Sequence, residues 1–165
     1  MNLVYHPDPF LEEQVKEVDI ENPSFDPLEL KKEMIDFMLV NNGIGLSANQ
    51  IGLDAQVFVM GDSVENSTIC INPTVLQYTS DTVLDIEGCL SFPNIFVKVK
   101  RPKEILAKWY NENLEEQIVK IEGYSAKCYL HEWDHLHGIT FKDRVSKIKW
   151  DMAVKKARKL EKNLA

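Results

Sequence analysis

Three stretches of the chain carry apolar residues at helical spacing. The first begins at Asp26, which can cap a helix, and Pro27, which fits a first helical turn. We expect this helix to end near Asn-Asn-Gly at 41–43. Its apolar face consists of Leu30, Met34, Phe37 and Met38.

The second stretch places four side chains at i, i+4, i+7 and i+11, which is one continuous helical stripe. Gly123 marks its start, and Gly138 is well placed as its C-terminal stop. Leu130 and Trp133 add apolar surface on other sides, so we expect this helix to be enclosed. The stripe consists of Tyr124, Cys128, His131 and His135.

A third helix is predicted after Ser146, which can serve as its cap. It runs to the end of the sequence, over residues 146–165. Its apolar face consists of Trp150, Val154, Ala157 and Leu160.

Between the first two helices, short apolar runs and alternating patterns predict β-strands. A strand at 68–71 is closed by Asn-Pro, and we expect residues 74–78 to return antiparallel to it. Strands at 104–109 and 117–121 flank Asn111-Glu112-Asn113, a hairpin turn. Further strands are predicted at 56–60, at 96–100 and, as an edge strand, at 139–141. The first 25 residues read as an extended arm.

Consecutive strands with segregated helices favour an α+β fold over one in which strands alternate with helices. We therefore expect antiparallel β-sheets packed around the central helix, with an N-terminal helix and a C-terminal helix. Residues 1–165 suit a single domain, and 44% hydrophobic and 27% charged residues are ordinary for a globular protein.

The composition also indicates the kind of compartment and partner to expect. The sequence has no apolar run near 18 residues, and its start lacks the pattern of a signal peptide, so we expect no membrane span. Three widely spaced cysteines argue against a disulfide framework and suit a reducing compartment. A net charge of -7 gives no general expectation of binding to DNA.

The central helix contains His131-Glu132-Trp133-Asp134-His135, which has the H-E-x-x-H form. Two histidines four residues apart share one helical face and can bind one divalent metal ion, with Glu132 placed to move protons beside it. The alternative is chance, since two His and a Glu will sometimes fall in this order on a helix that binds nothing. Enclosed imidazoles, however, usually have a bonding partner.

Catalytic zinc sites typically use three protein ligands, so a third must come from elsewhere. Cys89 is favoured because it lies in Glu-Gly-Cys-Leu-Ser (87–91), where the glycine permits a close approach and the sequence is bend-like. Cys70 lies in an apolar strand pattern and suits the core. The remaining candidates are His6, His137, Cys128 or a carboxylate.

Three segments together resemble the motifs of the peptide deformylase family, which are G-φ-G-φ-A-A-x-Q (φ apolar), E-G-C-x-S and H-E-x-D-H. They are Gly-Ile-Gly-Leu-Ser-Ala-Asn-Gln at 43–50, Glu-Gly-Cys-Leu-Ser at 87–91 and the histidine motif at 131–135. The resemblance extends over nearly the whole chain. It implies a metal-dependent hydrolase that removes the N-formyl group from the formyl-methionine of nascent polypeptides and releases formate.

The resemblance also implies residue roles. Cys89, His131 and His135 are expected to bind one divalent metal ion, Fe(II) in the physiological enzyme, with Zn(II), Ni(II) or Co(II) able to replace it. Glu132 would act as the general base. The Gln50 side chain and the Leu90 backbone N–H would stabilise the oxyanion.

An apolar pocket should receive the methionine side chain of the substrate. Its expected lining comes from the first motif and the helix stripe; the alternative is that these side chains are ordinary core. The lining candidates are Ile44, Gly45, Tyr124 and Cys128.

Three positions depart from the family pattern. Ser47 replaces the usual first alanine, Leu130 stands where many members carry Gln, and Phe96 lies where many carry an Arg thought to hold substrate. These departures bear on the surroundings of the site and on substrate preference, rather than on the chemistry.

Two acidic residues fall in segments that we expect to be buried, Glu87 and Asp134. Buried carboxylates need partners, and Arg101, at the end of an alternating strand, is the nearest plausible one. We therefore predict an ion-pair cluster of these three residues.

The C-terminal segment 146–165 carries seven basic and two acidic residues, a net charge of +5 in an acidic chain. Such asymmetry predicts a basic patch, and for a deformylase the natural partner is the ribosome. The alternative is a solvated helix face whose lysines only maintain solubility. We expect a cytoplasmic monomer, bacterial or, if phage-encoded, in host cytoplasm.

Two rival functions fit parts of the sequence. A zincin-type metallopeptidase would keep the histidine motif but use another third ligand. A catalytically inactive relative would only bind peptides or the ribosome, and it would not need Glu132, Gln50 and Cys89 together.

Overall fold

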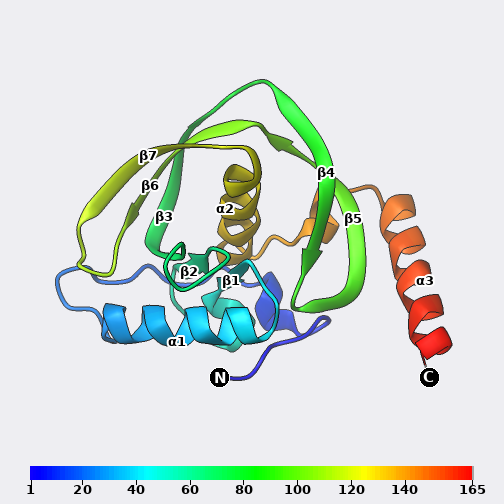
Figure 1. The fold of residues 1–165 in the computed structure, drawn as a ribbon, viewed down its shortest axis with the longest axis horizontal. Coiled ribbons are helices and arrows are strands. Elements are labelled where there is room, and N and C mark those ends of the chain that lie inside the picture. The colour runs from blue at the N-terminus through cyan, green and yellow to red at the C-terminus, as the bar shows by residue number, and fades with distance from the viewer. Residues whose placement is uncertain (165) are drawn as a thin grey trace.

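The structure, a computed structural model, describes residues 1–164 and has one helix at its centre (Figure 1). This helix, α2 (Gly123–Leu136), lies between a five-stranded sheet and a two-stranded ribbon. α1 (Pro27–Val40) runs along one side of the sheet, and α3 (Lys147–Leu164) lies outside the ribbon. All strand pairs are antiparallel, so the predicted α+β fold around a central helix is confirmed.

The five-stranded sheet has the order β1-β2-β3-β6-β7, which leaves one edge of β1 unpaired within the sheet. Its apolar face packs on α2 through Phe58 and Tyr129, whose rings meet edge to face at 5.0 Å. The strands are β1 (Gly45–Ser47), β2 (Val57–Met60), β3 (Thr68–Tyr78), β6 (Glu104–Tyr110) and β7 (Glu116–Glu122).

The ribbon consists of β4 (Thr82–Cys89) and β5 (Phe92–Pro102), joined by a tight turn. Alternation along β5 buries Val97 and Val99 against a small core with Phe92, Phe141 and Trp150, which α3 completes. No strand was predicted over 82–91, because its mixed residues lack an apolar alternation and Glu87 is a charge on the buried face.

Two further strand predictions are wrong. Residues 74–78 do not return as a separate strand; β3 continues through Asn72, whose positive φ of 47° and a shift in register absorb the irregularity. Residues 139–141 form no edge strand. Instead Thr140 caps a 3-10 turn, η3 (Phe141–Arg144), through the Asp143 carboxylate.

The predicted helix ends are confirmed. Asp26 accepts hydrogen bonds from the N–H groups of Leu28 and Glu29 and begins α1, which ends at Val40. α3 buries Trp150 and Ala157, whereas Leu160 is 46% exposed and not packed inward as predicted. Among the described residues no helix is long and apolar enough to cross a membrane.

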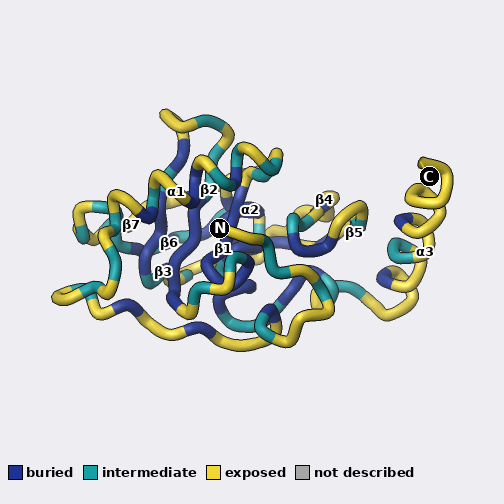
Figure 2. The backbone as a smooth tube through the Cα atoms, turned by 90° about the horizontal axis from the view of Figure 1, so that it is seen from below, coloured by how far each residue is buried: buried dark blue, intermediate teal, exposed yellow. Residues whose placement is uncertain are grey.

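The amino-terminal arm is more ordered than predicted. It contains a 3-10 turn, η1 (Pro9–Glu12), and its backbone pairs with the residue that follows α2 through a bridge between Gln14 and His137. A second turn, η2 (Ala48–Ile51), follows β1. Figure 2 shows that burial concentrates in the sheet and α2, while α3 is mostly exposed.

Candidate active site

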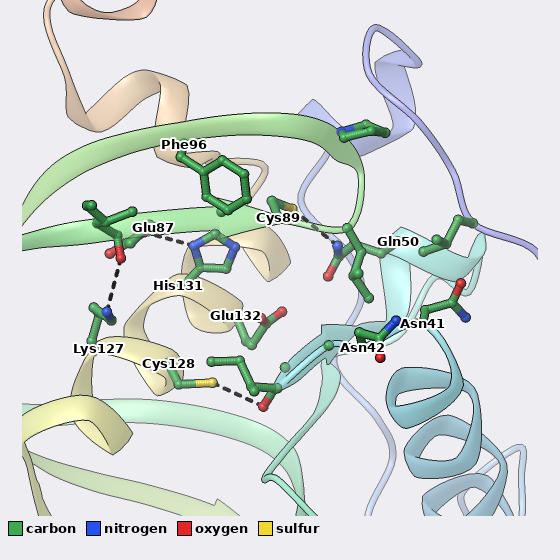
Figure 3. A pocket seen from close by; sticks show the side chains of 18 of the residues that line it. Asn41, Asn42, Gln50, Glu87, Cys89, Phe96, Lys127, Cys128, His131 and Glu132 are labelled. Atoms are coloured by element: carbon green, nitrogen blue, oxygen red, sulfur yellow. Dashed lines mark hydrogen bonds and ion pairs between the residues drawn. The ribbon is translucent and has the colours of Figure 1, made fainter. Parts of the chain in front are cut away.

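A cavity of about 510 Å³ opens between β1, β4 and α2. The three sequence motifs meet there, although they lie far apart in the chain (Figure 3). Leu3 and Tyr5 of the amino-terminal arm also line it, which no sequence pattern signals.

Cys89, His131 and His135 bring their ligand atoms within 4.8 Å of one another. His135 Nε2 lies 3.3 Å from both Cys89 Sγ and His131 Nε2. Donor atoms ~2.0–2.3 Å from one ion in a tetrahedral shell would be about 3.3–3.8 Å apart, so the group fits a single divalent metal ion. Fold geometry thus selects Cys89 from the candidates for the third donor.

His131 is oriented by a buried carboxylate. Its Nδ1 lies 2.9 Å from Glu87 Oε2, a contact that leaves Nε2 directed at the other two donors. Burial would raise the pKa of Glu87, but hydrogen bonds from His131 and Arg101 lower it to about 2. Glu87 therefore stays ionised and holds the imidazole ring in place.

The predicted ion-pair cluster is confirmed. The Arg101 guanidinium donates to Glu87 at 2.8 and 3.0 Å and to Asp134 at 2.6 Å, and all three side chains are at most 4% exposed. Arg144, from η3, adds two bonds to Asp134 at 2.6 and 2.9 Å. No sequence pattern indicates Arg144, because only the turn after α2 brings it back to that helix.

Glu132 is a buried acid, and one of its carboxylate oxygens is unpaired in the part of the chain that the structure describes. Its Oε2 has no hydrogen-bond partner among the described residues, and the carboxylate lines the cavity. Burial raises the pKa of Glu132 to about 7, against the opposing charge of His131. A side chain at Gly45 would collide with this carboxylate, which explains the second glycine of the first motif.

Gln50 reaches the site from η2. Its Nε2 donates to Cys89 Sγ at 3.3 Å and to Ser91 Oγ at 3.1 Å, while its Oε1 accepts from the N–H and hydroxyl of Ser47. The side chain amide is therefore fixed with its donor toward the metal-ligand group. Ser47, the departure from the family pattern, contributes one of these bonds.

The predicted pocket residues Ile44, Gly45, Tyr124 and Cys128 all line the cavity, as does Leu90. Tyr124 is 59% exposed, so the helix stripe is not buried at its first residue. Cys128 Sγ lies 3.4 Å from the carbonyl oxygen of Ile44 and ties α2 to the start of β1.

Three other ligand candidates lie elsewhere. His6 stacks on Phe92 at 4.7 Å, and the His137 ring lies tilted against Trp133 at 4.4 Å, on another face of α2. Cys70 is fully buried in the sheet core.

The geometry of the site agrees with the comparisons between this chain and known proteins. The sequence profile of the family described as "Polypeptide deformylase" matches residues 1–150. The chain belongs to this family. It is therefore a hydrolase that removes the formyl group from nascent peptides, and its Cys–His–His group suits one metal ion.

Relatives match over most of their length. A peptide deformylase of Wolbachia pipientis (subsp. Culex pipiens, strain wPip) is 39% identical over 147 residues, which cover 82% of each protein. The crystal structure of peptide deformylase from Ehrlichia chaffeensis matches with a TM-score of 0.86 at 32% identity, over 99% of this chain and 97% of that one. That from Plasmodium falciparum gives a TM-score of 0.87 at 30% identity, over 98% and 96%.

Proposed function

We propose that Cys89, His131 and His135 hold one divalent metal ion during deformylation, with Glu132, Gln50 and Leu90 acting on the reacting atoms. The observation that supports this most directly is the spacing of the three donor atoms. A divalent ion there supplies Lewis acidity, which makes hydroxide available from water near neutral pH.

Glu132 accepts the proton of the attacking water and passes it to the leaving amine. Its buried and unpartnered Oε2 suits this role, because no protein donor competes for the proton-accepting oxygen. Gly45 provides the space into which the carboxylate fits. The products are formate and a free α-amine.

Gln50 and Leu90 stabilise the oxyanion that develops when water adds to the formyl carbon. The Gln50 amide donor is already fixed toward the site by Ser47, so it needs no reorganisation during the reaction. The Leu90 N–H belongs to the residue that follows Cys89 in the sequence, which supports it as the second donor.

The first side chain of the substrate, methionine, enters beside the metal-ligand group. Ile44, Gly45, Tyr124 and Cys128 supply the walls, and Phe96 adds an exposed apolar surface over Gly88. An apolar pocket of this kind favours an unbranched, uncharged side chain.

The native ion in this proposal is Fe(II), with Zn(II), Ni(II) or Co(II) as substitutes. A thiolate and two imidazoles suit several of these ions. A ferrous site with a thiolate ligand is sensitive to oxygen, so activity should decline on exposure to air.

The decisive experiment is anaerobic purification, metal analysis and measurement of formate released from formyl-Met-Ala-Ser. We expect about one metal ion per chain and release of formate. Cys89→Ala should lose both the ion and the activity while far-UV circular dichroism stays unchanged, with Cys70→Ala as the control that keeps its metal. Retention of metal by Cys89→Ala would favour a zincin-type peptidase, and metal without formate release would favour an inactive relative.

We further propose that residues 1–165 act as one monomeric catalytic domain in a cytoplasm and do not bind DNA. The basic segment 146–165 would dock on the ribosome, where formylated chains emerge; its last residue, Ala165, lies outside the described residues. The exposure of the lysines on α3 supports this part of the proposal.

A further inference from the structure

Lys127 is a cation in the wall of the candidate active site. It stands one helical turn before His131 on α2, and its side chain is only 10% exposed. Among the residues that line the cavity it is the single lysine or arginine. Burying an ammonium group is costly, so its position calls for compensating contacts and has electrostatic consequences.

The ammonium group joins two walls of the cavity. It donates to Asp85 Oδ2 at 2.6 Å. It also donates to the Ile86 carbonyl oxygen at 3.1 Å (Figure 3), and both acceptors lie on β4. It also lies 4.5 Å from the centre of the Tyr124 ring on α2. Ile86 and Tyr124 themselves line the cavity, so Lys127 fixes the gap between them.

The positive charge is only partly neutralised. The Asp85 side chain is 52% exposed, and water screens its charge. The remaining contacts are a carbonyl dipole and an aromatic face, which carry no net charge. Lys127 therefore contributes a partly screened positive charge at the wall beside Tyr124 and Cys128, where it acts against the carboxylates of Glu87 and Glu132 that line the same cavity.

We propose that Lys127 is a specificity-determining residue that makes the pocket prefer a first side chain with an electron-rich tip. This rests on the proposed function, in which that side chain enters beside Tyr124 and Cys128. A thioether sulfur is a weak acceptor, so methionine is favoured over norleucine, a hydrocarbon chain of similar length. The oxygen of methionine sulfoxide is favoured further, and the cationic tip of lysine is repelled.

The test compares kcat/KM for four peptides of the form formyl-X-Ala-Ser, with X as norleucine, methionine, methionine sulfoxide or lysine. The variants are Lys127→Met, which keeps helix propensity and removes the charge, and Lys127→Arg, which keeps the charge. Lys120→Met is the matched control, since Lys120 pairs with Glu104 on the far strands of the sheet.

Lys127→Met should reduce the preference for methionine over norleucine roughly fivefold, about the effect of one weak hydrogen bond, and that for the sulfoxide more. It should raise the rate with lysine. Lys127→Arg and Lys120→Met should keep the order of the wild type. If Lys127→Met changes all four rates by the same factor, Lys127 only holds the walls together and the proposal is overturned.

Asp85→Asn is a second variant that tests the proposal even if Lys127→Met fails to fold. It leaves the cation with less neutralisation and should increase the preference for the sulfoxide over norleucine; an unchanged or smaller preference overturns the proposal. Failure of the wild type to release formate from formyl-Met-Ala-Ser would instead count against the proposed function. The two failures are thus distinguishable.

Discussion

α2 and α3 are both regular helices rich in ionisable residues, but these residues are mostly buried in α2 and exposed in α3. Ten of the 14 residues of α2 are buried, compared with two of the 18 residues of α3. In α2 Asp134 is bonded to two arginines, whereas Glu132 Oε2 and His135 Nδ1 are buried without a hydrogen-bond partner among the described residues. In α3 the charges lie in water, where each contributes little.

Substitutions near α2 should therefore have larger effects than substitutions on α3. A polar group removed from the surroundings of α2 leaves a buried partner unsatisfied or removes a reacting group, and both effects are large. A charge removed from α3 leaves hydrated neighbours.

Glu132→Gln would test whether the unpartnered acid of α2 is a reacting group. The amide keeps size and burial but cannot accept the proton, so we expect kcat to fall by ~10²–10⁴-fold with metal content unchanged. The measurement is formate release together with metal analysis, and Glu116→Gln on exposed β7 is the control. Activity within about threefold of wild type would exclude Glu132 as the base.

Arg101→Ala would test whether the buried charges near α2 support the fold. It leaves Glu87 and Asp134 without their shared partner, and breaking such a pair costs about 3–5 kcal/mol. Denaturant unfolding should show this loss, and metal retention should decrease because Glu87 orients His131. Arg144→Ala should cost less, since that side chain is 40% exposed and Arg101 still serves Asp134. Wild-type stability in Arg101→Ala would mean that the cluster does not stabilise the protein.

Gln50→Leu would separate transition-state stabilisation from substrate binding. Loss of one oxyanion donor costs roughly 10²–10³-fold in kcat, and we expect KM to change much less. Steady-state kinetics with formyl-Met-Ala-Ser provide both values, with Gln117→Leu on β7 as the control. An effect on KM alone would make Gln50 a substrate-binding residue.

Truncation after Ala157 is the mildest change, and it tests whether α3 is dispensable for catalysis. It keeps Trp150 and Ala157, the buried contacts of α3, so turnover of a short formyl-peptide should stay nearly unchanged. Ribosome co-sedimentation should weaken, and binding by the full chain should fall steeply with salt if phosphates are contacted.

A variant with glutamine at Lys155, Lys156 and Lys159 separates charge from length in the same assay. Equal sedimentation of all forms at low salt would leave the basic surface without a ribosomal role. A large loss of peptide turnover on truncation would show that α3 supports the active site as α2 does.

Local sequence rules located the helices well, because their signals come from neighbours in the chain. Asp26 and Pro27 define the start of α1, and Gly138, with a φ of 70°, follows the end of α2. The strands were harder. β4 lacks an apolar pattern because its buried face carries Glu87, whose partner lies on another strand. The sequence predicts two strands where the structure has the single strand β3, because the pairing of β3 with β6 across the irregularity at Asn-Pro cannot be predicted from one strand alone.

The candidate site likewise contains residues that the sequence predicts and residues that only the fold reveals. The motif residues could be named from the sequence because metal binding and proton transfer need particular residue types at particular spacings. Arg144 and Lys127 could not, because their roles depend on contacts with residues 10 and 42 positions away. A charged residue on a helix is usually solvated. The burial of Lys127 beside β4 is therefore apparent only in the folded structure.

By itself, the sequence determined the helical spacing of His131, Glu132 and His135, the helix ends and the α+β class. Each depends on interactions within a few residues, which are the same in any fold that contains them. Only the tertiary structure decided that Cys89, 46 residues before His135, lies 3.3 Å from it. It also decided that Arg101 joins Glu87 to Asp134 and that Glu132 is left without a partner. Such contacts depend on strand pairing and burial across the whole chain, which no local pattern specifies.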